Sequence, residues 1–150
     1  MAGYSGTPLA KKLGIVEGTL VCAVGAPRNY LELLAPLPAG AVVSSRQSAK
    51  TDVVHLFGTR KAELAKALRS AAEKLRPDAA IWISWPKRAS KLSTDVTEDT
   101  VRELALPLGL VDVKVCAVDE TWSGLRLVVR KENRKTWGRS TTGSGPQSRP

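Results

Sequence analysis

Cysteine, histidine and long apolar runs are all scarce in this chain of 150 residues. The two cysteines, Cys22 and Cys116, lie inside short apolar runs, so we interpret them as small buried hydrophobes rather than as ligands or a disulfide. The only histidine, His55, also lies in an apolar segment and is interpreted as a core residue rather than a catalyst. We therefore expect no metal site.

Hydrophobic targeting signals are missing as well. Residues 1–13 contain no apolar core of a signal peptide, and no apolar run approaches the length of a membrane span. We therefore expect a cytoplasmic protein without a membrane partner. A hydrophobic content of 43% and a charged content of 25% fit one globular domain, which we place at residues 1–134.

Acidic residues are too few to balance the basic ones, and the formal charge is +9. From Arg130 onward, six Lys and Arg residues face the single acid Glu132, so more than half of the excess lies at this end. Residues 135–150 are rich in Ser, Thr and Gly and are predicted to form a disordered basic tail. A solvated tail is one interpretation, and a weak, salt-sensitive contact with nucleic acid is the other.

Short apolar runs predict six strands, and runs that do not alternate with polar residues are typical of strands buried on both faces. The predicted strands are residues 19–24, 41–43, 52–57, 79–84, 111–118 and 125–130. Apolar spacing and breakers predict helical segments at residues 7–14, 29–34, 60–75 and 97–108. Thr59 and Thr97 are the predicted N-caps of the two longer helices.

Only the six residues Asp119 to Gly124 connect the last two predicted strands. A parallel crossover needs a dozen residues or more, so this pair is predicted to be an antiparallel hairpin. The earlier strands alternate with helices, which is typical of parallel pairing. The predicted fold class is therefore α/β, a three-layer domain with a mostly parallel sheet that ends in an antiparallel hairpin.

Parallel sheets bind ligands at the carboxyl ends of their strands, and four loops of this chain are expected to share that rim. Three of these loops carry a cation and two carry a tryptophan, which suits a planar or anionic ligand that stacks on an indole and pairs with Lys or Arg. The candidate ligand-binding residues are Arg28, Arg60, Trp85, Lys87, Arg88, Lys91, Asp119, Glu120 and Trp122.

Each of these residues also has a purely structural interpretation. Trp85 can plug the end of the sheet, where Pro86 stops the strand, and Trp122 can cover apolar surface at the hairpin. Arg28 and Arg60, taken singly, are typical surface charges. Only the convergence of the four loops favours a binding site.

Two resemblances extend this interpretation. The segments 77–83 and 108–111 resemble the entries to the fifth and sixth strands of class I, S-adenosylmethionine-dependent methyltransferases, a Rossmann-like fold. More specifically, Trp85-Pro86-Lys87, Thr94-Asp95 and the segments 106–112 and 114–125 resemble the bacterial family catalogued as domain of unknown function 3052. This second resemblance runs from Gly3 to about Arg134 and implies no particular activity.

The methyltransferase resemblance implies a Gly-x-Gly-x-Gly turn after the first strand and an acid after the second. Here the first turn is Gly25-Ala26-Pro27, in which proline removes an N–H donor, and Ser44-Ser45-Arg46 follows the second strand. The chain is also one strand short and lacks the usual N-terminal helices, so the fold is a reduced version. S-adenosylmethionine is therefore a doubtful cofactor, and fold alone does not transfer activity.

Three functions remain open. The leading hypothesis is a non-catalytic binding protein whose rim holds a small anionic or nucleotide-like ligand, or an acidic segment of a partner. The second is a degenerate methyltransferase, with Asp119 or Glu120 as general base. The third is a nucleic-acid accessory protein that acts through the basic tail.

Overall fold

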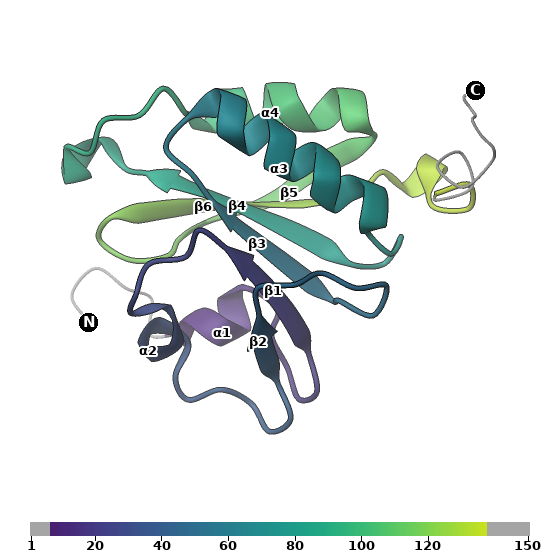
Figure 1. Ribbon diagram of the computed structural model, residues 1–150, viewed down its shortest axis with the longest axis horizontal. Helices are drawn as coiled ribbons and strands as arrows, with labels where there is room; N and C mark the ends of the chain where they lie inside the picture. The colour runs from purple at the N-terminus through teal and green to yellow at the C-terminus, as the bar shows by residue number, and fades with distance from the viewer. Residues whose placement is uncertain (1–6, 138–150) are drawn as a thin grey trace.

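One mixed sheet of six strands organises the computed structural model, which describes residues 7–137 (Figure 1). The strand order is β2-β1-β3-β4-β6-β5, and β2, β1, β3 and β4 are mutually parallel. β6 pairs antiparallel with both β4 and β5, which confirms the predicted hairpin. The strands are β1 (Leu20–Val24), β2 (Val42–Ser44), β3 (Val53–Phe57), β4 (Ala80–Pro86), β5 (Leu110–Ala117) and β6 (Trp122–Val129).

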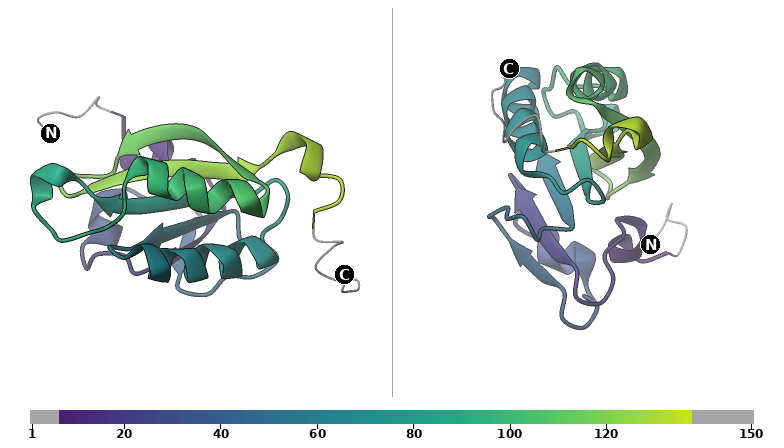
Figure 2. Two further views of the ribbon diagram at one scale, coloured as in Figure 1. Left: turned by 90° about the horizontal axis from the view of Figure 1, so that it is seen from above. Right: turned by 90° about the vertical axis from the view of Figure 1, so that its right-hand side faces the viewer.

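Helices lie on both faces of this sheet, which confirms the predicted three layers (Figure 2). α3 and α4 cover one face, and the short helices α1 and α2 lie against the other. The helices are α1 (Leu9–Lys12), α2 (Tyr30–Leu34), α3 (Lys61–Lys74) and α4 (Glu98–Ala105), with 3-10 turns η1 (Arg88–Ser90), η2 (Leu106–Leu108) and η3 (Lys131–Asn133).

The N-termini of the two longer helices show one correct prediction and one error. Thr97 caps α4 as predicted, in a reciprocal capping box with Thr100. Thr59 does not cap α3, because Arg60 occupies the N-cap position and provides no side-chain cap. Instead, the Lys61 N–H donates to Asp95 Oδ1 at 2.7 Å, so an acid from the loop after β4 satisfies the start of α3.

The core consists of two hydrophobic clusters, one on each face of the sheet. The cluster below α3 and α4 contains residues such as Leu68, Ile83 and Leu125. The other cluster lies against α1 and α2 and contains Trp82, which is fully buried and whose indole N–H donates to the Leu13 carbonyl at 3.0 Å. That bond fastens α1 to the centre of the sheet.

His55 is a fully buried core residue, as the sequence indicated. The Tyr30 hydroxyl lies 2.7 Å from His55 Nδ1, and the Ser84 hydroxyl lies 2.7 Å from His55 Nε2. Because burial removes the imidazole from water and penalises its charged form, the pKa of His55 falls to about 3. The ring is therefore neutral at physiological pH, and it stacks on Phe57 with centroids 4.2 Å apart.

The cysteines also behave as predicted, since Cys22 is buried, Cys116 is half-buried and both are free. Among residues 7–137, no cluster of His, Cys, Asp or Glu side chains could hold a metal ion. Within the same residues, no helix is both long and apolar enough to cross a membrane. The predicted tail begins at residue 135, and Trp137 within it packs against the core and donates its indole N–H to the Leu75 carbonyl. Residues 138–150 lie outside the described part of the chain.

Candidate functional site

The carboxyl ends of β1, β3 and β4 meet at one rim of the sheet, beside the turn between β5 and β6 (Figure 1). The Lys87 N–H donates to the Thr121 carbonyl at 2.8 Å, which joins the loop after β4 to that turn. The Gly58 N–H donates to the Ser84 carbonyl at 3.1 Å, which joins the loop after β3 to β4. Gly25 in the loop after β1 lies against the Phe57 carbonyl, so the four loops adjoin as the sequence predicted.

The two tryptophans of these loops lie on opposite faces of the sheet. β4 continues through Trp85 and Pro86, which pair with Ser123 and Trp122, whereas the sequence predicted that the strand ends at Ser84. Trp85 is only 7% exposed and belongs to the core below α3 and α4, so it plugs the sheet and offers no ring to a ligand. Trp122 is half-buried and packs edge-on against Phe57 at 5.1 Å, which leaves part of its indole exposed at the rim.

The acids of the rim are mostly engaged with backbone. Asp119 Oδ1 accepts the N–H groups of Thr121 and Trp122, both at 2.8 Å, so this carboxylate shapes the hairpin turn. Asp95 accepts the N–H at the start of α3. Glu120 is exposed. Asp119 and Asp95 therefore hold loop backbone in place and form no ion pair with the cations of the rim within residues 7–137.

Within residues 7–137, the predicted cations of the rim have no acidic partners. Lys87 is half-buried, and the other four are exposed on the loops after β1, β3 and β4. In the part of the chain that the structure describes, none of these side chains forms an ion pair. Lys87 adjoins the hairpin turn, Arg88 begins η1 and Lys91 follows it. Arg28 and Arg60 lie farther along the rim, on the loops after β1 and β3. The five residues are Arg28, Arg60, Lys87, Arg88 and Lys91.

Three residues that the sequence did not select extend the site on the Trp122 side. Cys116 of β5 packs against the same cluster as Trp122, and burial raises the pKa of its thiol. The charges of Lys12, Lys114 and Lys87 oppose that rise, so three ammonium groups lie close enough to act on one half-buried thiol. The alternation along β5 places Lys114 and Cys116 on one face, and this pairing could have been predicted from the sequence. The approach of Lys12 on α1 could not, because it depends on how distant elements pack.

The turn after β1 differs from the cofactor turn that the methyltransferase resemblance implies. Gly25 has φ +72°, and a Cβ there would lie 2.8 Å from the Phe57 carbonyl oxygen, so this glycine serves the packing of β1 against β3. Ser44 is the last residue of β2, and Ser45 and Arg46 follow it where the resemblance implies an acid. The residues at these two positions do not fit the usual S-adenosylmethionine site.

Solved structures define the class to which this fold belongs. The chain is similar to the B. subtilis tRNA methyltransferase TrmK (TM-score 0.57, 13% identity), covering 85% of this chain and 67% of that one. It is equally similar to a SAM-dependent methyltransferase from Aquifex aeolicus (TM-score 0.57, 16% identity), covering 81% of this chain and 88% of that one. The magnesium protoporphyrin IX methyltransferase from Synechocystis with bound SAM also matches (TM-score 0.51, 14% identity), covering 81% and 74%. The fold is thus that of class I methyltransferases.

Residues 38–131 match the family described as "Protein of unknown function (DUF3052)", and the chain belongs to this family. The matched segment begins before β2 and ends at the start of η3, so it contains five of the six strands and the hairpin. No curated protein matches the chain in sequence.

Proposed function

We propose that this protein binds a small anionic, nucleotide-like ligand at the rim and does not itself catalyse a reaction. The observation that supports this proposal is the hydrogen bond from the Lys87 N–H to the Thr121 carbonyl, which sets the half-buried Lys87 beside the turn that leads into the half-buried Trp122. A phosphate pairs with the ammonium groups, and a base or another planar group packs on the indole.

The electrostatics of the rim favour an anion over a cation or a neutral ligand. Asp119 and Asp95 are hydrogen bonded to backbone N–H groups, and the neighbouring cations lack ion pairs within residues 7–137. Lys12 and Lys114 add positive charge on the Trp122 side. Positive charge gathered at one rim attracts anionic ligands. An acidic segment of a partner protein would use the same cations and competes with the small ligand in this proposal.

A fluorescence titration tests the site directly. We expect adenosine and guanosine di- and triphosphates to quench tryptophan emission, because Trp122 is the partly exposed indole at the rim whereas Trp82 and Trp85 are buried. Lys87→Ala is expected to weaken binding about tenfold, the loss of one charge-assisted hydrogen bond of about 1.5 kcal/mol.

Two variants serve as controls for this titration. Trp122→Phe keeps an aromatic ring against Phe57 and should remove the quenching without removing the binding seen by calorimetry. Lys66→Ala removes an exposed lysine of α3 and should leave the affinity unchanged. If the emission stays constant across the nucleotide panel in the wild type and in Lys87→Ala alike, the proposal fails.

A second candidate, a degenerate methyltransferase, is favoured by the similarity to the Synechocystis methyltransferase structure with bound SAM. Under this alternative the loop after β1 contacts S-adenosylmethionine despite its single glycine and its proline. Because the usual glycines and the acid after β2 are missing, we expect calorimetry at millimolar S-adenosylmethionine to give no binding heat. Saturable heat that is lost in a Gly25→Ala variant still shown to be folded would favour the methyltransferase instead.

The nucleic-acid role of the basic tail stays a prediction. Of the six basic residues from Arg130 onward, four lie in the described part of the chain, whereas Arg139 and Arg149 lie outside it. Its distinguishing property is salt dependence, because a contact made by Lys and Arg to phosphates weakens steeply as salt rises.

A further inference from the structure

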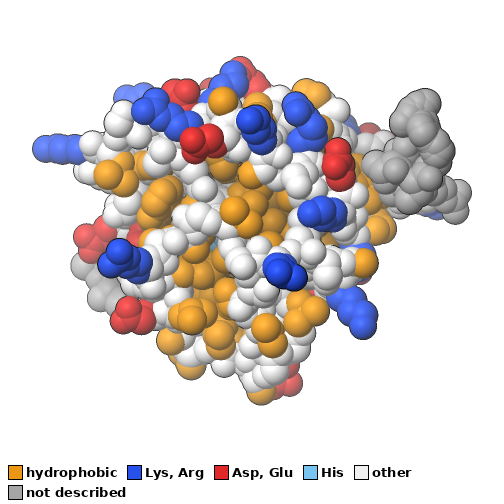
Figure 3. All heavy atoms as spheres, in the orientation of Figure 1, with side chains coloured by type: hydrophobic (Ala, Val, Ile, Leu, Met, Phe, Trp, Pro, Cys, Tyr) orange, Lys and Arg blue, Asp and Glu red, His pale blue; other side chains and the backbone are white. Residues whose placement is uncertain are grey.

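The face of the sheet below α3 is left partly open over β1 and β2. The connection from β2 to β3 and the connection from β3 to β4, which contains α3, move in the same direction across the sheet. If both are right-handed, they lie on the same face, so the β2–β3 connection crosses β1 on the α3 side. That connection, residues 45–52, contains no helix. Val24 and Val42 are consequently 42% and 52% exposed. Figure 3 shows hydrophobic side chains gathered below α3 on this face, with Lys and Arg around them.

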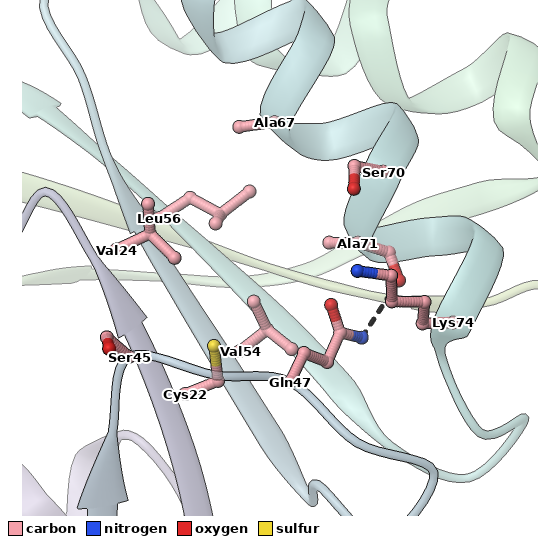
Figure 4. A pocket seen from close by; sticks show the side chains of 10 residues that line it. All are labelled: Cys22, Val24, Ser45, Gln47, Val54, Leu56, Ala67, Ser70, Ala71 and Lys74. Carbon is pink, nitrogen blue, oxygen red and sulfur yellow. Dashed lines mark hydrogen bonds between the residues drawn. The ribbon is translucent and has the colours of Figure 1, made fainter.

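A cavity of about 180 Å³ lies in this opening, between α3 and the strands β1 and β3 (Figure 4). Its floor is apolar and is formed by Val24, Val54 and Leu56, with Ala67 of α3 above them. Gln47 closes one side, because its side-chain N–H donates to the Ala71 carbonyl at 3.0 Å and ties the β2–β3 connection to α3. The cavity is therefore a built pocket rather than a gap between two elements.

The single charge of this pocket favours an anion. Lys74 is the only charged residue among those that line it, and its ammonium group turns back toward the cavity (Figure 4). The Ser45 hydroxyl lies on the β2 side, the Ser70 hydroxyl lies on α3, and the Cys22 thiol points up from the floor. Lys74 acts electrostatically on that thiol and opposes the rise that burial causes in its pKa, so its ammonium lies within electrostatic range of Cys22. Within residues 7–137, Lys74 forms no ion pair.

We propose that this pocket is a second binding site, separate from the rim, for a small aliphatic monocarboxylate. The carboxylate pairs with the Lys74 ammonium and accepts a hydrogen bond from Ser70, while the hydrocarbon chain lies on Val24, Val54 and Leu56. One inward cation over an apolar floor matches one carboxylate on a short hydrocarbon chain. A nucleotide is too large and too polar for this floor, which distinguishes the pocket from the rim.

Methyl NMR spectroscopy of the full chain, with hexanoate as the probe, tests this site. We expect hexanoate to shift the methyl signals of Val24, Val54 and Leu56, and to do so saturably. Lys74→Gln should weaken hexanoate binding about tenfold, because it removes a charge-assisted hydrogen bond. 1-Hexanol, which has the same chain without the charge, should bind the wild type no better than hexanoate binds Lys74→Gln.

Matched variants separate this site from general surface effects and from the rim. Arg69→Gln removes a cation of α3 that does not line the pocket and should leave hexanoate binding unchanged. Lys87→Ala should also leave it unchanged, whether or not the rim binds nucleotides. Ala67→Leu fills the cavity with a good helix former and should abolish the methyl shifts. Shifts that are absent at millimolar hexanoate, or that are equal for hexanoate and 1-hexanol, overturn the proposal.

Discussion

Lowering the pH from 7.5 to 5 is expected to reduce the free energy of unfolding by about 2 kcal/mol, through His55 alone. The imidazole is fully buried between Tyr30 and Ser84, and its pKa falls from 6.5 to about 3 in the folded state. Between these two pKa values, His55 is protonated in the unfolded chain and neutral in the folded protein. Stability is therefore complete above pH 6.5 and declines as the pH falls toward 3.

The chain is suited to this measurement because it contains one histidine. Urea unfolding at pH 7.5 and at pH 5 gives the difference. Asp78 and Asp112 contribute little in this range, because hydrogen bonds from Arg76 and Arg102 hold their pKa values below the ordinary value, which itself lies below pH 5. His55→Leu should be less stable than the wild type at pH 7.5, since Tyr30 and Ser84 lose their partner, yet should show almost no change between the two pH values. Equal stability of the wild type at both pH values would contradict the buried neutral imidazole.

The order of the elements was predictable because it depends on local sequence properties. Continuous apolar runs identified β1 and β3, and both are covered on at least part of each face. The six residues between the last two apolar runs were too few for a crossover, so chain length alone required the hairpin. Thr97 was readable as an N-cap because acids follow it in the first turn of α4.

Features that depend on distant residues were not predictable. Asp95 caps α3 from 34 residues away, and nothing near Thr59 signals that partner. The end of β4 was placed too early because a proline usually ends a strand, whereas β6 continues to pair as far as Pro86 and Lys87 still donates to the turn. The extra pairing leaves Trp85 on the α3 side, in the core.

The same distinction holds for the candidate site. The topology was sufficient to place four loops at one rim, because parallel strands deliver their carboxyl ends to the same edge. Topology alone did not show which side chains face a ligand. That depends on which face of the sheet each side chain lies on and on the residues of other elements that pack against it. Trp85 was therefore selected and is buried, while Lys12 and Lys114 were missed although they lie near Cys116.

Gly25→Ala is expected to lower the free energy of unfolding by about 3 kcal/mol, through two separate effects. Its φ of +72° disfavours any residue with a Cβ, at about 1 kcal/mol. The added Cβ would also lie 2.8 Å from the Phe57 carbonyl oxygen, which is backbone of the central strand β3 and cannot move aside cheaply. Forcing this contact costs about 2 kcal/mol, as other overpacking substitutions do.

Gly14→Ala provides the matched control, because Gly14 has φ +85° but no atom within 4 Å of its ideal Cβ. In the same urea unfolding experiment, Gly14→Ala should lower the free energy of unfolding by only about 1 kcal/mol, the cost of a positive φ for a residue with a Cβ. The difference between the two variants then isolates the contact between the β1 turn and Phe57. If both variants lose the same free energy of unfolding, packing against Phe57 does not require glycine at position 25. Gly25 would then be available for the close approach of a ligand. A large difference assigns this glycine to the fold and leaves recognition to the rim cations and Trp122.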